Sequence, residues 1–546
     1  MNQIINHPTR WDLERLYPKE KDPMFSTEIE MIEQLIETYK EDRNSEILSR
    51  IIQRIEKAEY YFYCLSTEQV GESTVALPHI KINNLKTEVR ILLQESNHEK
   101  SNFSENQSIS FVDNELKAWK DMYIQLRNRL EIHNDNEVIS FGKANYLAMN
   151  AETHYERLAV FSSLTEALEK EKNVFASALN QMGRLRNLKS NLLQEKEVLS
   201  QSLQVNGISK NALLEMWNAI EQNLEKLSSV LDFHKNSKET YTWHEFMTSE
   251  ETEQIEIPFS VAVENIYDAL KDIDEELARF ALQAITTGWV DAEPRDNKPP
   301  SGFCAPFLSE GESRISLRYD RTIDSLRILA HELGHAWHFY VMGDEQSTAF
   351  LDDYLPMSMA ESASIFFEMV LIDYLVKTAE SEELRKSLLS WKIRNSFNYV
   401  MAIRASFQFE QTFYEENQKG PLSADELENL SILSQKAAYG NSLTEYQPFV
   451  WMKYVQFYTA NVPFYNYPYT FGYLLSLGLL EIAKQDRSEF HSKYKKFLYE
   501  TGKRPVEELV EKYFHIDLAD SEFWEKSLLQ INKDIDEYLE LVKEEV

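Results

Sequence analysis

The chain has 546 residues, 43% of them hydrophobic and 12% aromatic, which is enough for a large buried core and excludes disorder over most of its length. Acidic residues exceed basic ones by 90 to 57, and the formal charge of −33 repels phosphate backbones and anionic lipid surfaces. We therefore expect a protein with neither nucleic acid nor membrane as a partner.

Cysteine content and the amino-terminal sequence both favour a cytoplasmic protein. Cys64 and Cys304 are the only cysteines, and although one disulfide is possible, so low a count is more typical of a reducing compartment. The first residues lack the basic and apolar regions of a secretory signal. The most apolar windows, near 365–376 and 472–483, are too short to span a bilayer.

The stretch from Pro78 to Pro258 is predicted to consist of long helices. No other proline lies between these two, glycine is scarce, and apolar residues recur among strong helix formers at a spacing near 3.6. Within this stretch, His244 and Glu245 stand side by side without a second histidine at metal-binding spacing. We interpret them as an ordinary surface pair.

The composition changes between Gly288 and Gly311, where GWVDAEPRDNKPPSGFCAPFLSEG contains four of the fifteen prolines. So much proline predicts an irregular backbone. From Arg314 to Tyr319, polar residues then alternate with apolar ones, and this period of two predicts a half-buried strand. Helical periodicity resumes after the strand and continues almost to the end of the chain.

The sharpest motif is His331-Glu332-x-x-His335, within RTIDSLRILAHELGHAWHFYVMG. Thr322 is predicted to cap a helix that runs to about Met342. Histidines four residues apart project from one helical face about one turn, ~5.4 Å, apart and can bind a single zinc ion. The glutamate beside the first histidine points toward the open side of the metal, where a general base is needed.

This motif also arises by chance, in roughly a few chains per hundred of such composition. Its place in a predicted helix, after an apolar stripe and with Gly334 where a neighbouring element can approach closely, favours the functional interpretation. His338 lies on the His335 side of the helix and is more simply a packed neighbour than a ligand.

A catalytic zinc site needs a third protein ligand and an open coordination position. The sequence PMSMAESASIFFEMVLIDYL is typical of a helix, and an antiparallel return would bring Glu361 beside the metal. The spacing Ser358-x-x-Glu361 equally fits a capping box, so both roles remain open. Glu368, two turns further on the same face, would either orient a liganding imidazole or interrupt an apolar helix at solvent.

These motifs resemble the oligoendopeptidase F family of zinc metallopeptidases, relatives of thimet oligopeptidase. The resemblance runs from WDLERLYP through SGFCAPF, LAHELGHAWH and MAESASIFFE to VPFYNYPYTFGYLLSLGLL. It implies a mostly helical, zincin-type fold with a deep central channel for short unstructured peptides and a small β-sheet next to the HExxH helix. We accordingly expect an N-terminal helical region over 1–110, one channel wall over 111–285 and the catalytic region over 286–546.

The same resemblance implies one Zn²⁺ ion bound by His331, His335 and Glu361, with Glu332 as the catalytic base. It also identifies the segment from Arg314 to Tyr319 as the family's edge strand, which can take an extended peptide by strand addition.

A tyrosine hydroxyl that stabilises the oxyanion is implied within the segment FYNYPYTFGYLL. Tyr469 and Tyr473 are the preferred donors and Tyr465 the third, with a packed aromatic helix entry as the structural alternative. Family members commonly carry a histidine shortly before these tyrosines. This chain has none there, and Gln456 is the nearest polar candidate for that place.

The predicted function is zinc-dependent hydrolysis of internal bonds in short peptides. Two alternatives remain open at this point: a helical HExxH carboxypeptidase, which would trim single carboxy-terminal residues, and a catalytically silent, zinc-containing peptide-binding scaffold. The sequence leaves the oligomeric state open. Cys304 is interpreted as a structural cysteine rather than a redox switch.

Overall fold

The computed structural model describes residues 7–17, 24–68, 76–97, 103–134, 137–151, 153–236, 241–248, 256–295, 298, 301–343, 349–351, 355–460 and 462–543. They form two compact units, and each unit is assembled from three stretches of chain. Unit 1 consists of Met1–Ser101, Thr252–Ser381 and Leu475–Asp517; unit 2 consists of Asn102–Glu251, Glu382–Leu474 and Leu518–Val546. The expected regions 1–110, 111–285 and 286–546 are each continuous, and that division stays a prediction.

Unit 1 begins with three helices, α1 (Met24–Asp42), α2 (Ser45–Glu68) and α3 (Ala76–Asn97). Isoleucines at helical spacing hold them together: Ile32 and Ile36 of α1 are buried against Ile52 and Ile55 of α2. The other helices that the structure describes in unit 1 are α11 (Phe259–Lys271), α12 (Glu275–Thr286), α13 (Ile323–Met342), α15 (Met357–Thr378), α21 (Arg487–Tyr499) and α22 (Val506–Phe514).

A small three-stranded sheet lies in unit 1, in the order β3 (Val290–Asp291), β5 (Glu312–Ser316) and β4 (Phe303–Phe307). β3 runs parallel to β5 and β4 antiparallel to it, and a short 3-10 turn, η1 (Leu308–Glu310), joins β4 to β5. One face packs on the amino-terminal segment around Trp11 and on α2, and helix α13 contacts β4 and β5. The sheet expected next to the HExxH helix is therefore present.

The strand predicted at Arg314–Tyr319 is found two to three residues earlier, at Glu312–Ser316, and it is buried rather than half-buried. Arg314 and Ser316, which the alternation placed at solvent, are 0% and 2% exposed. The Arg314 guanidinium donates to the carbonyl oxygen of Asp12 at 3.0 Å and pairs with Glu312, also at 3.0 Å. The prediction was wrong because the amino-terminal segment, more than 300 residues earlier in sequence, covers this face.

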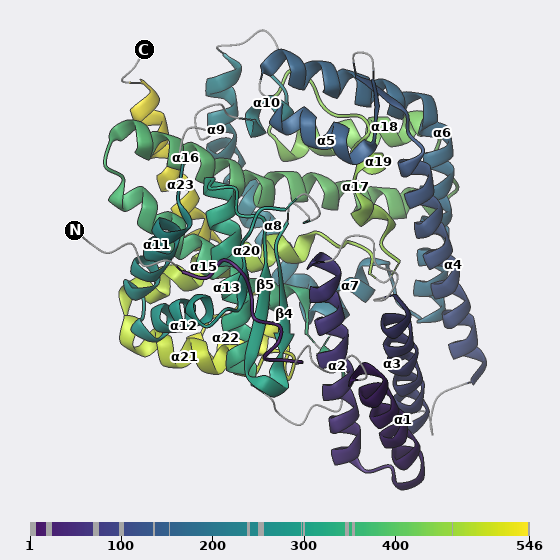
Figure 1. The fold of residues 1–546 in the computed structure, drawn as a ribbon. Coiled ribbons are helices and arrows are strands. Elements are labelled where there is room, and N and C mark those ends of the chain that lie inside the picture. The colour runs from purple at the N-terminus through teal and green to yellow at the C-terminus, as the bar shows by residue number, and fades with distance from the viewer. Residues whose placement is uncertain are drawn as a thin grey trace. The chain divides into compact units, whose positions relative to one another are not determined.

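Unit 2 is built on long helices, as the scarcity of proline predicted; α4 and the 39-residue α6 run side by side (Figure 1). Its elements are α4 (Phe103–Asn128), β1 (Ile132–Asn134), β2 (Glu137–Ile139), α5 (Phe141–Asn150), α6 (His154–Leu192), α7 (Leu199–Asn206), α8 (Lys210–Gln222), α9 (Leu224–Lys235), α10 (Trp243–Met247), α16 (Glu382–Phe397), the π-helical turn η2 (Asn398–Ala402), α17 (Ile403–Asn417), α18 (Ala424–Ala438), α19 (Val450–Lys453), the 3-10 turn η3 (Val455–Tyr458) and α23 (Ser521–Lys543). Helix α20 (Tyr467–Gln485) contains the boundary between the units.

The mostly helical fold class is thus confirmed. Strands are confined, among the described residues, to the sheet of unit 1 and the antiparallel pair β1–β2 of unit 2. Of the helices that the structure describes, none is both long and apolar enough to cross a bilayer.

Candidate metal centre

Helix α13 presents the two histidines of the HExxH motif on one face. The helix begins as predicted, with the Thr322 hydroxyl accepting from the backbone N–H of Ser325, and ends at Met342. The imidazoles of His331 and His335 have ring centroids 4.7 Å apart, and their Nε2 atoms approach to 3.1 Å. Both rings remain partly exposed, so the space in front of them is accessible to solvent.

Helix α15 approaches α13 unusually closely at Gly334. A Cβ built on Gly334 would lie 2.6 Å from the carbonyl oxygen of Ala363 and 2.6 Å from the Cα of Ser364. Only a residue without a side chain allows this contact, which confirms the expectation that a neighbour approaches here. The close approach brings the first turns of α15, including Glu361, beside the histidines.

The Glu361 carboxylate joins the two imidazoles in a group that could hold a metal ion. Its Oε2 lies 3.3 Å from Nε2 of His331 and 3.6 Å from Nε2 of His335. Two ligand atoms each ~2.0–2.1 Å from a tetrahedral zinc ion lie about 3.3 Å apart. The three separations therefore match the edges of a tetrahedral coordination sphere, and the donor set of two imidazoles and one carboxylate is one that zinc prefers.

The capping-box alternative for Glu361 is not what the structure shows. Helix α15 begins after Pro356, and no side chain caps its first turn. Ser358 is buried, and the Glu361 carboxylate instead accepts from the Ser364 hydroxyl at 3.2 Å. The carboxylate is therefore directed toward the histidines and is held there by its own helix.

Glu368 supports the first histidine from behind. Its carboxylate is 0% exposed, and its Oε1 contacts Nδ1 of His331 at hydrogen-bonding distance. Arg327 contacts the same carboxylate oxygen at 3.2 Å. When Nδ1 donates its proton to Glu368, the lone pair of Nε2 is left for a metal. A carboxylate is a usual hydrogen-bond partner for the second nitrogen of a metal-binding imidazole. Sequence reasoning missed Arg327, although its position one turn before His331 was a usable signal.

Glu332 lies on the same helix and is 5% exposed. The backbone of Gly302, just before β4, packs against it: a Cβ there would come 2.8 Å from Oε1 of Glu332. Burial raises the pKa of this carboxyl to about 7, which suits a group that must both accept and return a proton near neutral pH. Gly302 carried no signal in the sequence.

The electrostatics of the group favour a positive charge between the ligands. Burial disfavours an imidazolium, yet Glu361 and Glu368 together raise the pKa of His331 well above its ordinary value. His335 has less carboxylate contact, and burial lowers its pKa to about 4. Burial also opposes ionisation of Glu361, but the adjacent imidazoles hold its pKa at about 2. A divalent cation supplies the charge that this arrangement attracts.

The expected edge strand is a central strand. β5 pairs with both β3 and β4, and the N–H groups of Leu317 and Tyr319 continue this pairing by donating to Asp291 and Ala292 at 3.0 and 3.2 Å. Ile315 and Ser316 are therefore paired on both sides and offer no edge for an added peptide. The prediction was wrong because β3, at the start of the proline-rich stretch, pairs with β5 on the side away from β4. Among the described residues, β4 is an edge strand of this sheet, and Gly302 directly precedes it in the sequence.

The three candidate tyrosines belong to unit 2, whereas the ligand group belongs to unit 1. Tyr465 and Tyr469 are half-buried, with ring centroids 6.1 Å apart. Tyr473 is 1% exposed; its ring stacks on Tyr399 and its hydroxyl bonds the Ser396 hydroxyl at 2.6 Å. Their roles as oxyanion donors stay predictions.

The two cysteines are free thiols. Cys64 is packed against Ala305 and Phe307 on one face of β4, whereas Cys304 packs near Phe339 on the α13 side. Successive strand residues point to opposite faces, which separates the two thiols. Burial raises the pKa of both thiols and keeps them in the protonated, unreactive form.

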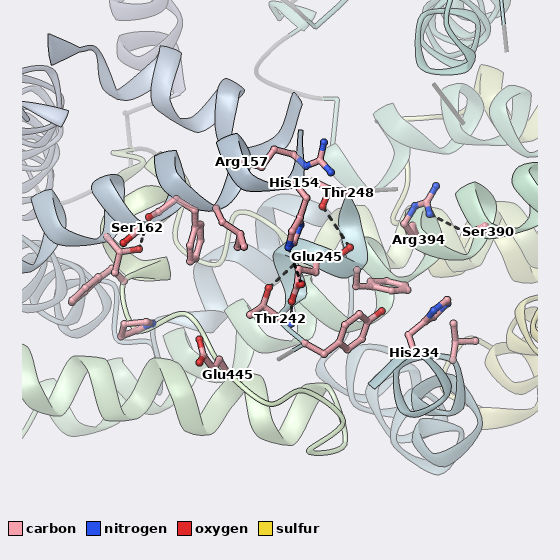
Figure 2. A pocket seen from close by; sticks show the side chains of 18 of the residues that line it. His154, Arg157, Ser162, His234, Thr242, Glu245, Thr248, Ser390, Arg394 and Glu445 are labelled. Atoms are coloured by element: carbon pink, nitrogen blue, oxygen red, sulfur yellow. Dashed lines mark hydrogen bonds and ion pairs between the residues drawn. The ribbon is translucent and has the colours of Figure 1, made fainter. Parts of the chain in front are cut away.

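A separate cavity of about 1450 Å³ lies wholly in unit 2 (Figure 2). Its polar groups are engaged with each other: Glu245 caps α10 by accepting from the N–H of Thr242 at 3.0 Å, and it lies 3.8 Å from His154. The interpretation of His244 as a surface residue was wrong, because its ring is 9% exposed and stacks on Phe161. None of the HExxH residues lines this cavity.

A second carboxylate–histidine group in unit 1 is less suited to a metal. Asp274, Glu276 and His491 bring their ligand atoms within 4.8 Å of one another. However, Asp274 caps α12 and Glu276 accepts from the ammonium of Lys495 at 2.6 Å. These carboxylates are already neutralised by protein groups.

Comparison with known proteins identifies the family of this chain. A model of peptidase family M3 matches residues 147–529. The oligoendopeptidase F homologue of Lactococcus lactis is 23% identical over 375 residues, 66% of this chain and 60% of that protein. The chain thus spans about three fifths of the length of that curated relative.

Solved structures show the same fold. A protein from Chlamydophila abortus that is assigned as a peptidase superposes with a TM-score of 0.80 at 19% identity and 98% coverage of both chains. Oligoendopeptidase F from Enterococcus faecium superposes with a TM-score of 0.63 at 18% identity, covering 98% of this chain and 100% of the other. Because the family model covers more than half of the sequence, the chain belongs to peptidase family M3, and the resemblance to oligoendopeptidase F is confirmed.

Proposed function

We propose that this protein is a zinc-dependent endopeptidase that hydrolyses internal bonds of short, unstructured peptides. The observation that carries the proposal is the convergence of His331, His335 and Glu361 at separations of 3.1, 3.3 and 3.6 Å, with Glu332 on the same helix. When bound there, one zinc ion would polarise the scissile carbonyl and make water acidic enough to react near neutral pH.

Within this proposal, Glu332 moves the proton. Its carboxylate takes a proton from the attacking water and returns it to the leaving nitrogen, so the same atom serves as base and then as acid. The raised pKa of the Glu332 carboxyl and its contact with Gly302 both support this role. Glu368 keeps His331 in the tautomer with a free Nε2 and thereby orients the ligand group.

A peptide substrate would add to β4 rather than to β5. β4 is the outer strand of the sheet, and it begins next to Gly302, which touches Glu332. An extended peptide paired with this edge uses backbone hydrogen bonds, which bind many sequences with little side-chain preference. Such pairing excludes folded substrates, whose backbone groups are already paired.

A tyrosine hydroxyl from the segment 465–473 is proposed to donate to the oxyanion, as the family resemblance implies. The accessible candidates are Tyr465 and Tyr469, because both are half-buried. Tyr473 is the weaker candidate, since its hydroxyl is buried and bonded to Ser396. This revises the order expected from the sequence.

The test replaces Glu332 by Gln, with the exposed Glu415→Gln as a matched control. We expect Glu332→Gln to bind zinc at one equivalent and to lose cleavage of an internally quenched peptide by at least ~10³-fold, since the substitution removes proton transfer. The control should cleave at the wild-type rate. Near-normal turnover by Glu332→Gln would refute its role as base.

Mass spectrometry of the products separates the alternatives. Internal cleavage of a mixed peptide library supports the endopeptidase, whereas stepwise loss of single carboxy-terminal residues supports the carboxypeptidase. A zinc-loaded wild-type protein that cleaves no peptide would be a silent scaffold.

A further inference from the structure

A buried ionic cluster lies in unit 2, formed by Arg186 of α6 with Glu410 and Tyr414 of α17. The side chains of Arg186 and Glu410 are only 2% and 4% exposed. The Arg186 guanidinium donates to the Tyr414 hydroxyl, which in turn donates to Oε1 of Glu410 at 3.2 Å. Burying two charged groups costs free energy, which their mutual attraction and further hydrogen bonds must offset.

This cluster holds both ends of the loop that follows α19. At the first end, Arg186 donates to the carbonyl oxygens of Phe457, at 3.2 Å, and of Thr459. At the far end, Oε1 of Glu410 accepts from the N–H of Phe464 at 3.1 Å. Between them, the Thr459 hydroxyl contacts the carbonyl oxygen of Val462 at 2.8 Å.

The backbone of Phe464, at the far end of the loop, has a conformation that is unfavourable without supporting contacts. Phe464 has φ of 52°, in the left-handed region that a side chain disfavours. Its buried ring packs on Phe407 and Tyr414, with centroids 5.2 and 5.3 Å away, and its N–H is held by Glu410. The cluster therefore maintains a strained residue in place.

Of the residues on either side of these anchors, Tyr465 has a proposed role in catalysis and directly follows the last anchor. Gln456, the nearest polar candidate for the place where relatives carry a histidine, directly precedes the first anchor. Because Tyr465 directly follows Phe464, a change in the backbone dihedral angles of Phe464 would move the Tyr465 side chain.

Arg186 and Glu410 form closer contacts with the loop backbone than with each other. The closest Arg186–Glu410 separation is 3.9 Å, longer than a direct hydrogen bond, whereas both side chains bond loop backbone: Arg186 at the carbonyl oxygens of Phe457 and Thr459, and Glu410 at the N–H of Phe464. Unit 2 contains a second buried pair, Lys392–Asp534, whose 2.8 Å contact joins α16 to α23 directly. The Lys392–Asp534 pair therefore serves as a comparison, because it is a buried ion pair that links two helices rather than anchoring a loop.

We propose that the cluster of Arg186, Glu410 and Tyr414 is a positioning device that fixes the described residues 455–460 and 462–464, and with them Gln456 and the adjoining Tyr465, for turnover. Glu410 is the positioning residue at its centre. This inference rests on the proposed peptidase function for its catalytic half, whereas the anchoring half stands on the contacts alone.

The experiment compares Glu410→Gln with Asp534→Asn, which makes the same carboxylate-to-amide change in the comparison pair. The first readout is hydrogen exchange of peptides covering residues 455–466. We expect exchange there to rise at least ~10-fold in Glu410→Gln and to stay at the wild-type level in Asp534→Asn, because only the former loosens the loop. Equal exchange in both variants would overturn the anchoring.

The second readout is the steady-state kinetics of the zinc-loaded protein on a quenched oligopeptide. We expect kcat to fall ~10- to 100-fold in Glu410→Gln, the effect of misplacing groups by about 1 Å, with KM within about twofold. Asp534→Asn should keep both constants. Where Glu410→Gln does not fold, Tyr414→Phe, which removes only the bridging hydroxyl, should show the same pattern more weakly.

The outcomes distinguish the two claims. A zinc-loaded wild-type protein that cleaves nothing overturns the proposed function and the catalytic half of this inference, and exchange still decides the anchoring. An active wild type with unchanged kcat in Glu410→Gln overturns this inference alone.

Discussion

Replacing Gly334 by Ala tests whether the contact between α13 and α15 assembles the metal centre. The added Cβ would lie 2.6 Å from backbone atoms of Ala363 and Ser364, whereas ordinary contact begins at 3.4 Å. The obstacle is backbone and cannot rotate away. Helix α15 must therefore move outward by about 0.8 Å, the difference between these two distances.

This movement affects the ligands more than the fold. Overpacking of this kind costs ~1–3 kcal/mol, which a protein with so large a core tolerates. Metal–ligand distances, however, tolerate only about 0.2 Å. Because Glu361 and Glu368 both lie on α15, the shift displaces one ligand and the support of another. We expect zinc affinity to fall at least ~10- to 100-fold, as when an imidazole's partner is removed.

The assay strips the metal by dialysis against a chelator and titrates zinc back in competition with a chromophoric chelator. Gly142→Ala is the control, because Gly142 is also helical and its added Cβ meets nothing within 4 Å. That variant should bind zinc normally and be as stable as the wild type or slightly more so. Wild-type zinc affinity in Gly334→Ala would refute the argument that this contact sets the ligand geometry.

Three further predictions follow from single contacts. Glu368→Gln should weaken zinc binding ~10- to 100-fold in the same titration, since His331 loses its carboxylate partner; unchanged affinity would count against that partnership. Gly302→Ala should lower kcat ~10-fold by displacing the Glu332 side chain while leaving zinc content at one equivalent, and a loss of zinc instead would show that the contact is structural. Burial lowers the pKa of His244 to about 4, so its contribution to stability is complete above ~pH 6.5 and is lost as the pH falls through 4. In urea unfolding, His244→Phe should therefore lose ~3 kcal/mol less than the wild type between pH 7 and pH 4, and parallel losses would contradict the shift.

Local sequence patterns were sufficient where the structure depends on neighbours in the chain. Helix α13 begins at its predicted cap and presents His331 and His335 together, because four-residue spacing places side chains on one face of any helix. The long helices between Pro78 and Pro258 followed similarly from the absence of proline in that stretch. These features need no knowledge of what packs against the helix.

Sequence patterns gave wrong predictions where burial or strand pairing depends on a residue far away in the chain. Alternation around Arg314 predicted an exposed face, yet residues near Asp12 cover it. The same strand was expected at an edge, but Val290 and Asp291 pair with it. His244 was expected at the surface, and Phe161 buries it. In each case the missing information was the identity of a partner more than twenty residues distant.

By itself, then, the sequence determined which helix carries the histidines, which carboxylate could act as base, and the family to which the chain is similar, since all of these are written in spacing and local propensity. Only the tertiary structure excludes the cap role for Glu361 and places its carboxylate beside both imidazoles, where the ligand role is a proposal. Its spacing satisfies both roles, and the choice depends on how closely α15 approaches α13 at Gly334, a distance set by packing between helices rather than by order along the chain.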